Sequence, residues 1–373
     1  MATPFAAKRG HDQLINSEFD STSDSTSESA SAESPFANPA RLRQLFVTGL
    51  DTMLARHPAL GVYILVLANA AQDPALWLPL RDKLLLRQRE HATAIKQTLR
   101  QGGKLDAPPD DLLVFLKLLA LDLTPDEFEL LQVSPPRQLG RWEVQFNPLR
   151  GLRPARMSEA RVSGISQPFD AAGFHFNKPF LAKEVLWQGE LAGLTTRLLY
   201  NKFPFAPWHG LLVPQPEQQQ PQLLTPETHG WAWQVAQEAS AAMPGFGLAY
   251  NSYGAYASVN HLHFQTFVRD RPLPLQNLEP NHYPLALQRF TDARDAWFHI
   301  DALHAAGTPY NLIFDQQGLH VVARARQGET ALHAWSPGFA WSEVAGVFSV
   351  SSREEYEGLT EAAIDQALTE LRV

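Results

Sequence analysis

The sequence predicts an α+β fold, in which an antiparallel sheet packs against a helix and follows an all-helical N-terminal segment. From residue 39 to about 133, apolar residues recur at helical spacing, and Pro and Gly fall between the runs. After Pro135 the chain changes to short runs rich in Trp, Phe, Val and Tyr, which Gly and Pro interrupt. These runs follow the order strand, strand, helix, strand, strand with short connections, which favours an antiparallel sheet packed against a helix.

The first 36 residues differ in composition from the rest, and we expect a disordered acidic tail there. Residues 17–35 are almost entirely Ser, Thr, Ala, Asp and Glu, which cannot bury enough apolar surface to offset the entropy of ordering. The tail also carries half of the formal charge of −8. The nearly neutral remainder argues against a nucleic acid partner, which normally requires a face rich in Lys and Arg, whereas small anions stay compatible.

Several classes of site and of location are excluded by what the sequence lacks. The 373 residues include no cysteine, so disulfides, thiolate nucleophiles and cysteine-ligated metals are ruled out. The longest apolar run, near residues 60–71, is too short to span a bilayer, and no apolar core follows the basic residues of the N-terminus. We therefore expect a cytoplasmic protein without a membrane partner. Any metal would need His and carboxylate ligands, and we expect neither a cofactor nor a bound metal.

The helical region at residues 37–140 should contain four or five helices. Basic side chains in the stretch 85–99 are compatible with a recognition helix, but Glu90 and flanking acids dilute their charge. We interpret this stretch as a solvated helix face and assign the helical region no chemistry.

The region after Pro135 yields individual strands and one well-marked helix. Thr225 offers a hydroxyl N-cap, Pro226 suits the first helical position and Glu227 favours the positive helix end. A helix should therefore run to about Ala242. The predicted strands cover residues 197–201, 209–213, 246–251, 257–268, 310–314 and 319–324. The last two resemble the first four in texture and suggest a second, degenerate lobe.

Two histidines and a glutamine carry the predicted chemistry. On a strand at residues 257–268, the side chains of His261, His263 and Gln265 would share one face at spacings of about 6 to 7 Å, which suits a phosphoryl group. Neutral imidazole is a competent nucleophile toward phosphorus, and a covalent intermediate splits one difficult displacement into two easier ones. Gln265 can donate to a phosphoryl oxygen without repelling it, and His261 can hold a tautomer or cap a phosphate.

From spacing alone, two other interpretations stay open. Two histidines on one sheet face can be packing residues. A His-x-His pair can also ligate zinc or iron, although a metal usually requires a third His or a carboxylate, and Gln265 is a poor substitute.

The flanking sequence resembles the histidine-triad (HIT) superfamily, in the branch whose motif ends in Gln. The most specific segment, Tyr250 to Gln265, reads Tyr-Asn-Ser-Tyr-Gly-Ala-Tyr-Ala-Ser-Val-Asn-His-Leu-His-Phe-Gln. The chain is most similar to the GDP-L-galactose and GDP-D-glucose phosphorylases, and it also resembles galactose-1-phosphate uridylyltransferases and diadenosine tetraphosphate phosphorylases. The resemblance covers roughly residues 141–373 and includes segments at 145–150, 167–170, 174–178, 200–204, 208–214, 340–346 and 356–360.

The resemblance implies a catalytic HIT-like lobe at residues 141–270 and a second HIT-like lobe at residues 271–373. It implies that His263 is the nucleophile that becomes nucleotidylated and that Gln265 contacts the phosphoryl group. Gln in place of a third His is associated in this branch with transfer to phosphate or a sugar phosphate instead of water. The nucleotide-binding residues implied by the resemblance are Asn201, Lys202, Asn251 and Ser258. The cations implied for phosphate or the sugar phosphate are Arg150, Arg153 and Lys178.

For several of these residues a structural interpretation stays open beside the functional one. Asn201 can be a turn former, and Asn251 and Ser258 can make ordinary turn and sheet hydrogen bonds. His209 fits strand packing as well as ligand contact, and Trp208 fits the core better than stacking on a base. The uridylyltransferases bind a structural metal partly through cysteines, so that site cannot be carried over.

We therefore expect a nucleotidyltransferase of the phosphorylase type that acts on a nucleoside diphosphate hexose, with a GDP-hexose favoured. Phosphate would be the acceptor, and hexose-1-phosphate and a nucleoside diphosphate would be the products. The partners expected are this nucleotide sugar, phosphate and, in a homodimer, a second copy. The alternatives are a dinucleoside polyphosphate phosphorylase, a sugar-1-phosphate nucleotidyltransferase, a non-catalytic nucleotide sensor and, as the weakest, a metal-dependent hydrolase.

Overall fold

The computed structural model describes residues 33–153, 162–336 and 338–373. Residues 1–32, which make up most of the predicted tail, lie outside the described residues. The tail prediction does not extend to its last residues, because Phe36 is only 2% exposed and packs against Phe246 with ring centroids 4.9 Å apart. Phe36 therefore belongs to the hydrophobic core.

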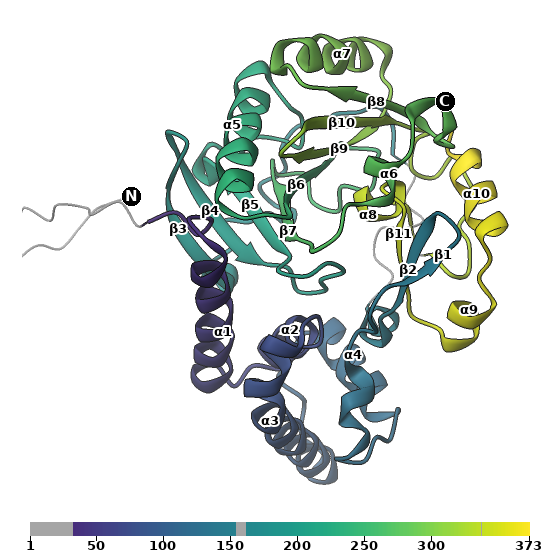
Figure 1. Cartoon of the computed structure of the whole chain (residues 1–373). Coiled ribbons are helices and arrows are strands. Elements are labelled where there is room, and N and C mark those ends of the chain that lie inside the picture. The colour runs from purple at the N-terminus through teal and green to yellow at the C-terminus, as the bar shows by residue number, and fades with distance from the viewer. Residues whose placement is uncertain (1–32, 154–161, 337) are drawn as a thin grey trace, which may run out of the picture. The chain divides into compact units, whose positions relative to one another are not determined.

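The helical region contains the four or five helices that the sequence predicts (Figure 1). Asn38 and Asp73 accept backbone N–H groups as N-caps of two of them, and a proline follows each cap at the first helical position. In the stretch 85–99 no side chain is fully buried, as expected for a solvated face. The elements are α1 (Pro39–Arg56), α2 (Leu60–Ala70), α3 (Pro74–Arg100), α4 (Pro109–Leu119) and the 3-10 helix η1 (Glu127–Leu131).

Within the described residues, one antiparallel sheet has the strand order β3-β4-β5-β7-β6-β9-β10-β8. The two predicted lobes meet inside it, because β6 pairs with β9 from Leu248↔Phe314 to Asn251↔Asn311. The strands are β3 (Val185–Leu191), β4 (Leu194–Tyr200), β5 (Gly210–Pro214), β6 (Phe246–Asn251), β7 (Phe264–Val268), β8 (Ala286–Phe290), β9 (Tyr310–Asp315) and β10 (Gly318–Ala323).

Hydrophobic clusters cover both faces of this sheet. Leu248 and Leu312 join the cluster under α5 (Pro226–Ala242) and α7 (Ala293–Ala306), whereas their neighbours Ala249 and Ile313 join the cluster on the opposite face. This alternation is the one expected for strands that are buried on both sides. The α+β class predicted from the sequence is confirmed, with helices packed against an antiparallel sheet.

A smaller sheet and several short helices complete the opposite face. Strand β2 pairs antiparallel with β1 and parallel with β11. The elements are β1 (Arg137–Leu139), β2 (Trp142–Phe146), β11 (Val347–Val350), α6 (Pro274–Asn277), α8 (Trp341–Val344), α9 (Arg353–Gly358), α10 (Glu361–Glu370) and the 3-10 helices η2 (Pro148–Leu152), η3 (Pro179–Glu184), η4 (Pro216–Gln218) and η5 (Pro280–His282).

Most strand and helix predictions hold, and one is wrong in a way that matters for the site. Helix α5 begins at Pro226 after the Thr225 cap and ends at Ala242, as predicted. The strand predicted at residues 257–268 begins only at Phe264. The backbone N–H groups of Leu262 and His263 donate to Gln220 and Gln222 in a loop and not to a neighbouring strand, so the segment before Phe264 does not continue the sheet.

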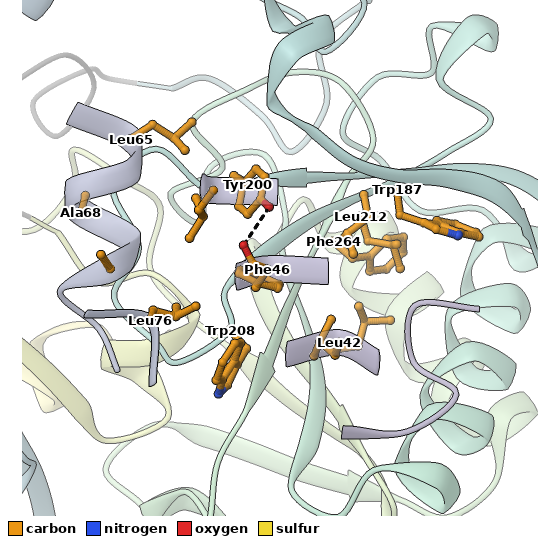
Figure 2. Close-up of a cluster of buried hydrophobic side chains, with 14 of the residues drawn as sticks. Leu42, Phe46, Leu65, Ala68, Leu76, Trp187, Tyr200, Trp208, Leu212 and Phe264 are labelled. Atoms are coloured by element: carbon orange, nitrogen blue, oxygen red, sulfur yellow. Dashed lines mark hydrogen bonds between the residues drawn. The ribbon is translucent and has the colours of Figure 1, made fainter. Parts of the chain in front are cut away.

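The helical region and the sheet share one hydrophobic core (Figure 2). Phe46 of α1 packs edge-on against Tyr200 of β4 and against Trp208, with ring centroids 5.3 and 5.5 Å apart. Trp208 is 9% exposed, so its interpretation as a core residue is confirmed. No helix among the described residues is both long and apolar enough to cross a membrane.

Candidate active site

His263 is fixed by two hydrogen bonds at the end of the turn segment that precedes β7. Its backbone N–H donates to Oε1 of Gln222 at 2.9 Å, and its Nδ1 lies 2.8 Å from the backbone oxygen of His261. A carbonyl oxygen can only accept, so Nδ1 carries the proton and Nε2 keeps its lone pair. Among the described residues Nε2 makes no hydrogen bond, so no group of the described chain engages its lone pair.

The ionisation of His263 keeps this lone pair available. Burial lowers the pKa of His263 to about 4, and the hydrogen bond to the His261 carbonyl opposes this shift only in part. The ring of Phe176 lies 5.0 Å away and contributes to the apolar surroundings. At neutral pH the imidazole is therefore uncharged and can act as a nucleophile.

The ring of His261 is engaged by the backbone on both sides. Nδ1 accepts the N–H of Phe176 at 3.1 Å, and Nε2 donates to the carbonyl oxygen of Pro216 at 3.2 Å. Burial, with a smaller contribution from His263, lowers its pKa to about 4. Both nitrogens are used, so the ring has no donor left to cap a phosphate. The backbone carbonyl of His261, and not its ring, holds the tautomer of His263.

The carboxamide of Gln265 on β7 has a fixed orientation. Its Oε1 accepts from Nε2 of His209 at 2.9 Å and from Nε1 of Trp341 at 2.8 Å. His209 must carry its proton on Nε2, because its Nδ1 accepts the backbone N–H of Phe205 at 3.3 Å. Since the oxygen faces both donors, the NH2 group of Gln265 is directed away from them and makes no hydrogen bond within the described chain. It is available as a donor to a phosphoryl oxygen.

His209 contacts the carboxamide of Gln265 and fixes its orientation. It is 1% exposed, and burial lowers its pKa to about 3. It is therefore neutral and cannot place a positive charge next to a substrate. The sequence was compatible with packing and with ligand contact for His209. In the structure its side chain is buried and bonded to Gln265.

Asn201 and Lys202 lie in the turn after β4. Asn201 Nδ2 approaches Nε2 of His209 to 3.3 Å, and its Oδ1 accepts the N–H of Phe203 at 3.0 Å, as in an Asx turn. The ammonium of Lys202 lies 2.5 Å from Oδ1 of Asp111 on α4. The structure thus brings Asn201 to the site and pairs Lys202 with a carboxylate of the helical region.

Asn251 and Ser258 are placed differently from one another. Asn251 is buried, and its Oδ1 accepts from Nδ2 of Asn311 at 2.7 Å and from the N–H of Trp341 at 3.0 Å. Its backbone oxygen also accepts from Nε2 of Gln222 at 2.9 Å. Asn251 therefore supports the two residues that orient Gln265 and His263. Ser258 is exposed in the turn segment and makes no hydrogen bond within the described chain.

Arg150 is a buried cation with unused capacity. Its guanidinium stacks on the ring of Phe205 with the central carbon 4.7 Å from the centroid. Its Nη2 lies 3.9 Å from a carboxylate oxygen of Glu343, while Nη1 has no partner within the described residues. Burial lowers the pKa of Arg150, and Glu343 opposes that shift. The ring beneath it, Phe205, also contacts His209 at 4.4 Å between centroids.

Arg153 and Lys178, the other predicted cations, are not buried with Arg150. Arg153 is exposed at the surface. Desolvation by nearby protein atoms, and to a smaller extent the charge of Arg150, lower its pKa to about 10. Lys178 donates from Nζ to the carbonyl oxygens of Ala171 and Ala172 at 3.1 and 3.4 Å. Within the described chain neither has a contact with the reacting histidine.

Arg324, which follows β10, is a second buried cation that the sequence did not reveal. Burial lowers its pKa to about 10, and its guanidinium carbon lies 5.0 Å from the ring centroid of Tyr256. It donates to the carbonyl oxygens of Ala325 and Phe339, and its Nη2 has no partner among the described residues. Glu343 is the carboxylate of the described chain that interacts with both Arg150 and Arg324. Two buried guanidinium groups and one carboxylate leave a net positive charge in this region.

Two further features of the described residues bear on the alternatives. No group of three or more His, Asp or Glu side chains is placed so that it could hold a metal ion.

A groove of about 740 Å³ lies beside the start of α5 and contains Gln218, Thr225 and Trp231, and none of the side chains predicted to react lines it. The groove is therefore separate from the predicted site around His263.

Comparisons with known proteins support the resemblance seen in the motif. Residues 141–267 match the family model described as GDPGP1-like, N-terminal domain. GDP-L-galactose phosphorylase 1 of Arabidopsis thaliana is 30% identical over 219 residues, which cover 49% of this chain and 47% of that protein. GDP-D-glucose phosphorylase 1 of Danio rerio is 36% identical over 139 residues, which cover 36% and 38% of the two chains.

Other comparisons are more limited. GDP-D-glucose phosphorylase 1 of Homo sapiens is 34% identical over 143 residues, 36% of this chain and 35% of that one. The chain thus spans half or less of the length of these curated relatives. The crystal structure of yeast Ap4A phosphorylase Apa2 superposes with a TM-score of 0.48 at 18% identity, over 65% of this chain and 89% of that one. The resemblance predicted from the motif is confirmed by this domain match, since residues 141–267 are similar to the GDPGP1-like N-terminal domain.

Proposed function

We propose that the protein is a nucleoside diphosphate hexose phosphorylase, with a GDP-hexose as the favoured substrate and inorganic phosphate as the acceptor. The observation that carries the proposal is the state of His263. Its Nδ1–H is held by a backbone carbonyl, its Nε2 is unprotonated and has no hydrogen-bond partner among the described residues, and its depressed pKa keeps the ring neutral at pH 7.

In the first step, the lone pair of Nε2 forms a bond to the α-phosphorus of the nucleotide sugar. The bond from that phosphorus to the oxygen bridging toward the β-phosphate breaks, and its electron pair leaves with hexose-1-phosphate. The ring gains positive charge as the N–P bond forms. The carbonyl oxygen of His261, 2.8 Å from Nδ1, stabilises that charge through the retained Nδ1–H.

In the second step, an oxygen of inorganic phosphate attacks the same phosphorus. The N–P bond breaks, its electron pair returns to Nε2, and a nucleoside diphosphate leaves. The oriented NH2 group of Gln265 supplies a neutral donor for a non-bridging oxygen in both steps. The unpaired guanidinium nitrogens of Arg150 and Arg324 favour an anionic substrate nearby, because buried positive charge without a counter-ion is costly.

The names of the relatives favour the base and sugar class. The relatives that match this chain at 30 to 36% identity are GDP-L-galactose and GDP-D-glucose phosphorylases. A neutral His209 and a carboxamide at Gln265 fit transfer to an anionic acceptor, since neither repels incoming phosphate. A dinucleoside polyphosphate or a second sugar phosphate would use the same covalent step and is distinguished by the substrate panel below.

The test measures covalent labelling and turnover together. Purified protein is incubated with GDP-, UDP- and ADP-hexoses carrying a labelled α-phosphate, and with a labelled dinucleoside polyphosphate, each with and without inorganic phosphate. We expect an acid-labile, base-stable adduct with the GDP-hexose, and its conversion to GDP when phosphate is added.

The variants locate the adduct on one residue. His263→Asn should form no adduct, whereas His57→Asn, at an exposed histidine after α1, should behave like the unmodified protein. An adduct that persists in His263→Asn, or turnover that needs no phosphate, would overturn the proposal.

A further inference from the structure

We propose that the helical region before residue 134 positions Gln265 for the reaction by holding residues 201–209, here called the linking loop, in one conformation. The inference rests on the proposed function for its kinetic consequence. Its structural part concerns the proton on His209 and can be measured independently of activity. It assigns a role to a region that the family match at residues 141–267 does not cover.

Three side chains of the helical region hold the linking loop. Asn69 donates from Nδ2 to the carbonyl oxygen of Asn201 at 2.8 Å. Gln72 donates from Nε2 to the carbonyl oxygen of Pro204 at 3.1 Å. Asp111 adds the ion pair to Lys202 described above. Asn69 is 2% exposed, so water does not compete for its amide. A buried amide that lost its hydrogen bond to the loop would destabilise the folded protein.

The linking loop is connected to the site through His209. The N–H of Phe205, next to Pro204, donates to Nδ1 of His209, which forces the His209 proton onto Nε2. That proton is donated to Oε1 of Gln265 at 2.9 Å. A continuous series of hydrogen bonds and one peptide linkage therefore joins Gln72 of the helical region to the carboxamide of Gln265.

The loop needs this external support because its own conformation is unfavourable. Trp208 has a φ of 54°, in the left-handed region that side chains other than Gly, Asn and Asp rarely adopt. Such a conformation persists where packing and hydrogen bonds over-determine it. Packing comes from Phe46 of α1, and Figure 2 shows Phe46 between Tyr200 and Trp208.

Helix α2, which carries Asn69, is tightly packed. Every residue of α2 except Gly61 is buried, so the helix that carries Asn69 is fixed on all sides. The hydroxyl of Tyr200, at the start of the loop, also donates to backbone oxygens of Leu45 and Phe46 in α1 at 3.4 and 3.3 Å. The helical region is therefore built as a scaffold for the loop and not as a separate appendage.

Releasing the loop should change the tautomer and then the chemistry. Without the Phe205 N–H, His209 can place its proton on Nδ1, and an unprotonated Nε2 can no longer donate to Gln265. The carboxamide then keeps only the indole N–H of Trp341 as a donor to its oxygen, so the orientation of its NH2 group toward the phosphoryl group is fixed less firmly. Because the NH2 group stabilises an anionic transition state, the loss should fall on kcat and spare KM.

The test uses the double variant Asn69→Ala/Gln72→Ala of the full chain. Asp51→Ala is the matched control, since Asp51 pairs with Lys83 at 2.5 Å between exposed faces of α1 and α3 and has no contact with the loop. Two quantities are measured: the ring 15N resonances of His209, which report its tautomer, and kcat and KM with GDP-hexose and phosphate. We expect a shift of the His209 tautomer toward Nδ1–H and a kcat at least about 10-fold lower with KM little changed.

Each result decides the inference. An unchanged tautomer in the double variant overturns it, and so does a shifted tautomer with full kcat. If the unmodified protein forms no adduct on His263, the proposed function fails while the tautomer measurement still decides the positioning. Should the double variant not fold, Gln72→Ala alone, at a half-buried side chain, provides the same comparison.

Discussion

Nε2 of His209 and Oε1 of Gln265 are joined by a hydrogen bond of 2.9 Å between two buried side chains on neighbouring strand ends. A second donor, the indole N–H of Trp341 at the start of α8, reaches the same oxygen at 2.8 Å. Two donors on one oxygen leave the carboxamide a single favourable orientation, with its NH2 group directed away from them. The residue that distinguishes this motif from a row of three histidines is therefore held by two side chains that lie far apart in the sequence.

Removing one of these donors should weaken catalysis without removing the nucleophile. In Trp341→Phe the ring stack with Phe267, at 4.5 Å between centroids, can persist while the hydrogen bond to Gln265 is lost. We expect kcat to fall by about 5- to 20-fold, in line with about 1 to 2 kcal/mol for one hydrogen bond.

Steady-state kinetics and thermal unfolding check this prediction together. Trp335→Phe is the control, because Trp335 is also a buried tryptophan, at 9% exposure against 1% for Trp341, but its indole has no hydrogen-bond partner among the described residues. Equal kcat values for the two variants would contradict the role given to Trp341.

The rate of adduct formation should depend on pH through His263. Its pKa is about 4 in the folded protein, so the ring is neutral above that value and protonated on Nε2 below it. The rate should stay level from pH 8 to about 5 and decline as pH falls through about 4. Rapid quenching of labelled enzyme across this range measures it. A midpoint near the ordinary histidine value of about 6.5 would show that burial does not keep the nucleophile neutral.

Local sequence was enough to predict many of the elements. Thr225 and Pro226 marked the start of α5 because capping depends on residues within one turn of a helix. The helices before residue 133 followed from periodicity, and the motif from Tyr250 to Gln265 led to the family resemblance. These features depend on neighbours that are close in sequence, so the sequence displays them directly.

The arrangement of the site depends on contacts that no local pattern displays. Alternation on a strand was the wrong reason for the grouping of His263 and Gln265, because the strand starts at Phe264. The backbone of His263 is instead fixed by Gln222, 41 residues earlier in a loop. Arg324 lies directly after β10, and a single arginine after a strand carries no signal of its own. Trp341 stood within a matched segment, but its partner could be found only in the folded chain.

The buried histidines should make the protein sensitive to mild acid. His263 has a pKa of about 4 when folded and about 6.5 when unfolded, so the unfolded chain binds the proton first as pH falls. Its stabilising contribution is complete above pH 6.5 and is lost between there and about 4, by an amount of about 3 kcal/mol.

Comparing variants isolates the contribution of this one group. The free energy of unfolding of His263→Asn should change less between pH 6.5 and 4 than that of the unmodified protein, whereas His57→Asn should show the full change. Urea unfolding at several pH values provides the numbers. Parallel curves for all three proteins would rule out the burial of a neutral His263 as the cause.

Glu184 should show the opposite dependence on pH. Burial raises its pKa to about 7, against the favourable charges of Lys202 and Lys183. A raised pKa in a carboxyl group means that the folded state holds the proton longer than the unfolded state. Stability is therefore lost as pH rises from about 4.5 to 7, and the cost persists above that range. Because Glu184 keeps partial access to solvent, we expect this cost to be about 1 to 2 kcal/mol.

Glu184→Gln keeps the shape of the side chain and removes the charge. It should raise the unfolding temperature at pH 8 by several degrees and leave it unchanged at pH 4, where the native carboxyl group is already neutral. Glu190→Gln, at an exposed position on the same edge of the sheet, controls for the loss of one negative charge and should show no such difference between the two pH values. If Glu184→Gln destabilises the protein at pH 8, the carboxylate must be charged and paired there, and the ion pair between Lys202 and Asp111 would have to be extended to include it.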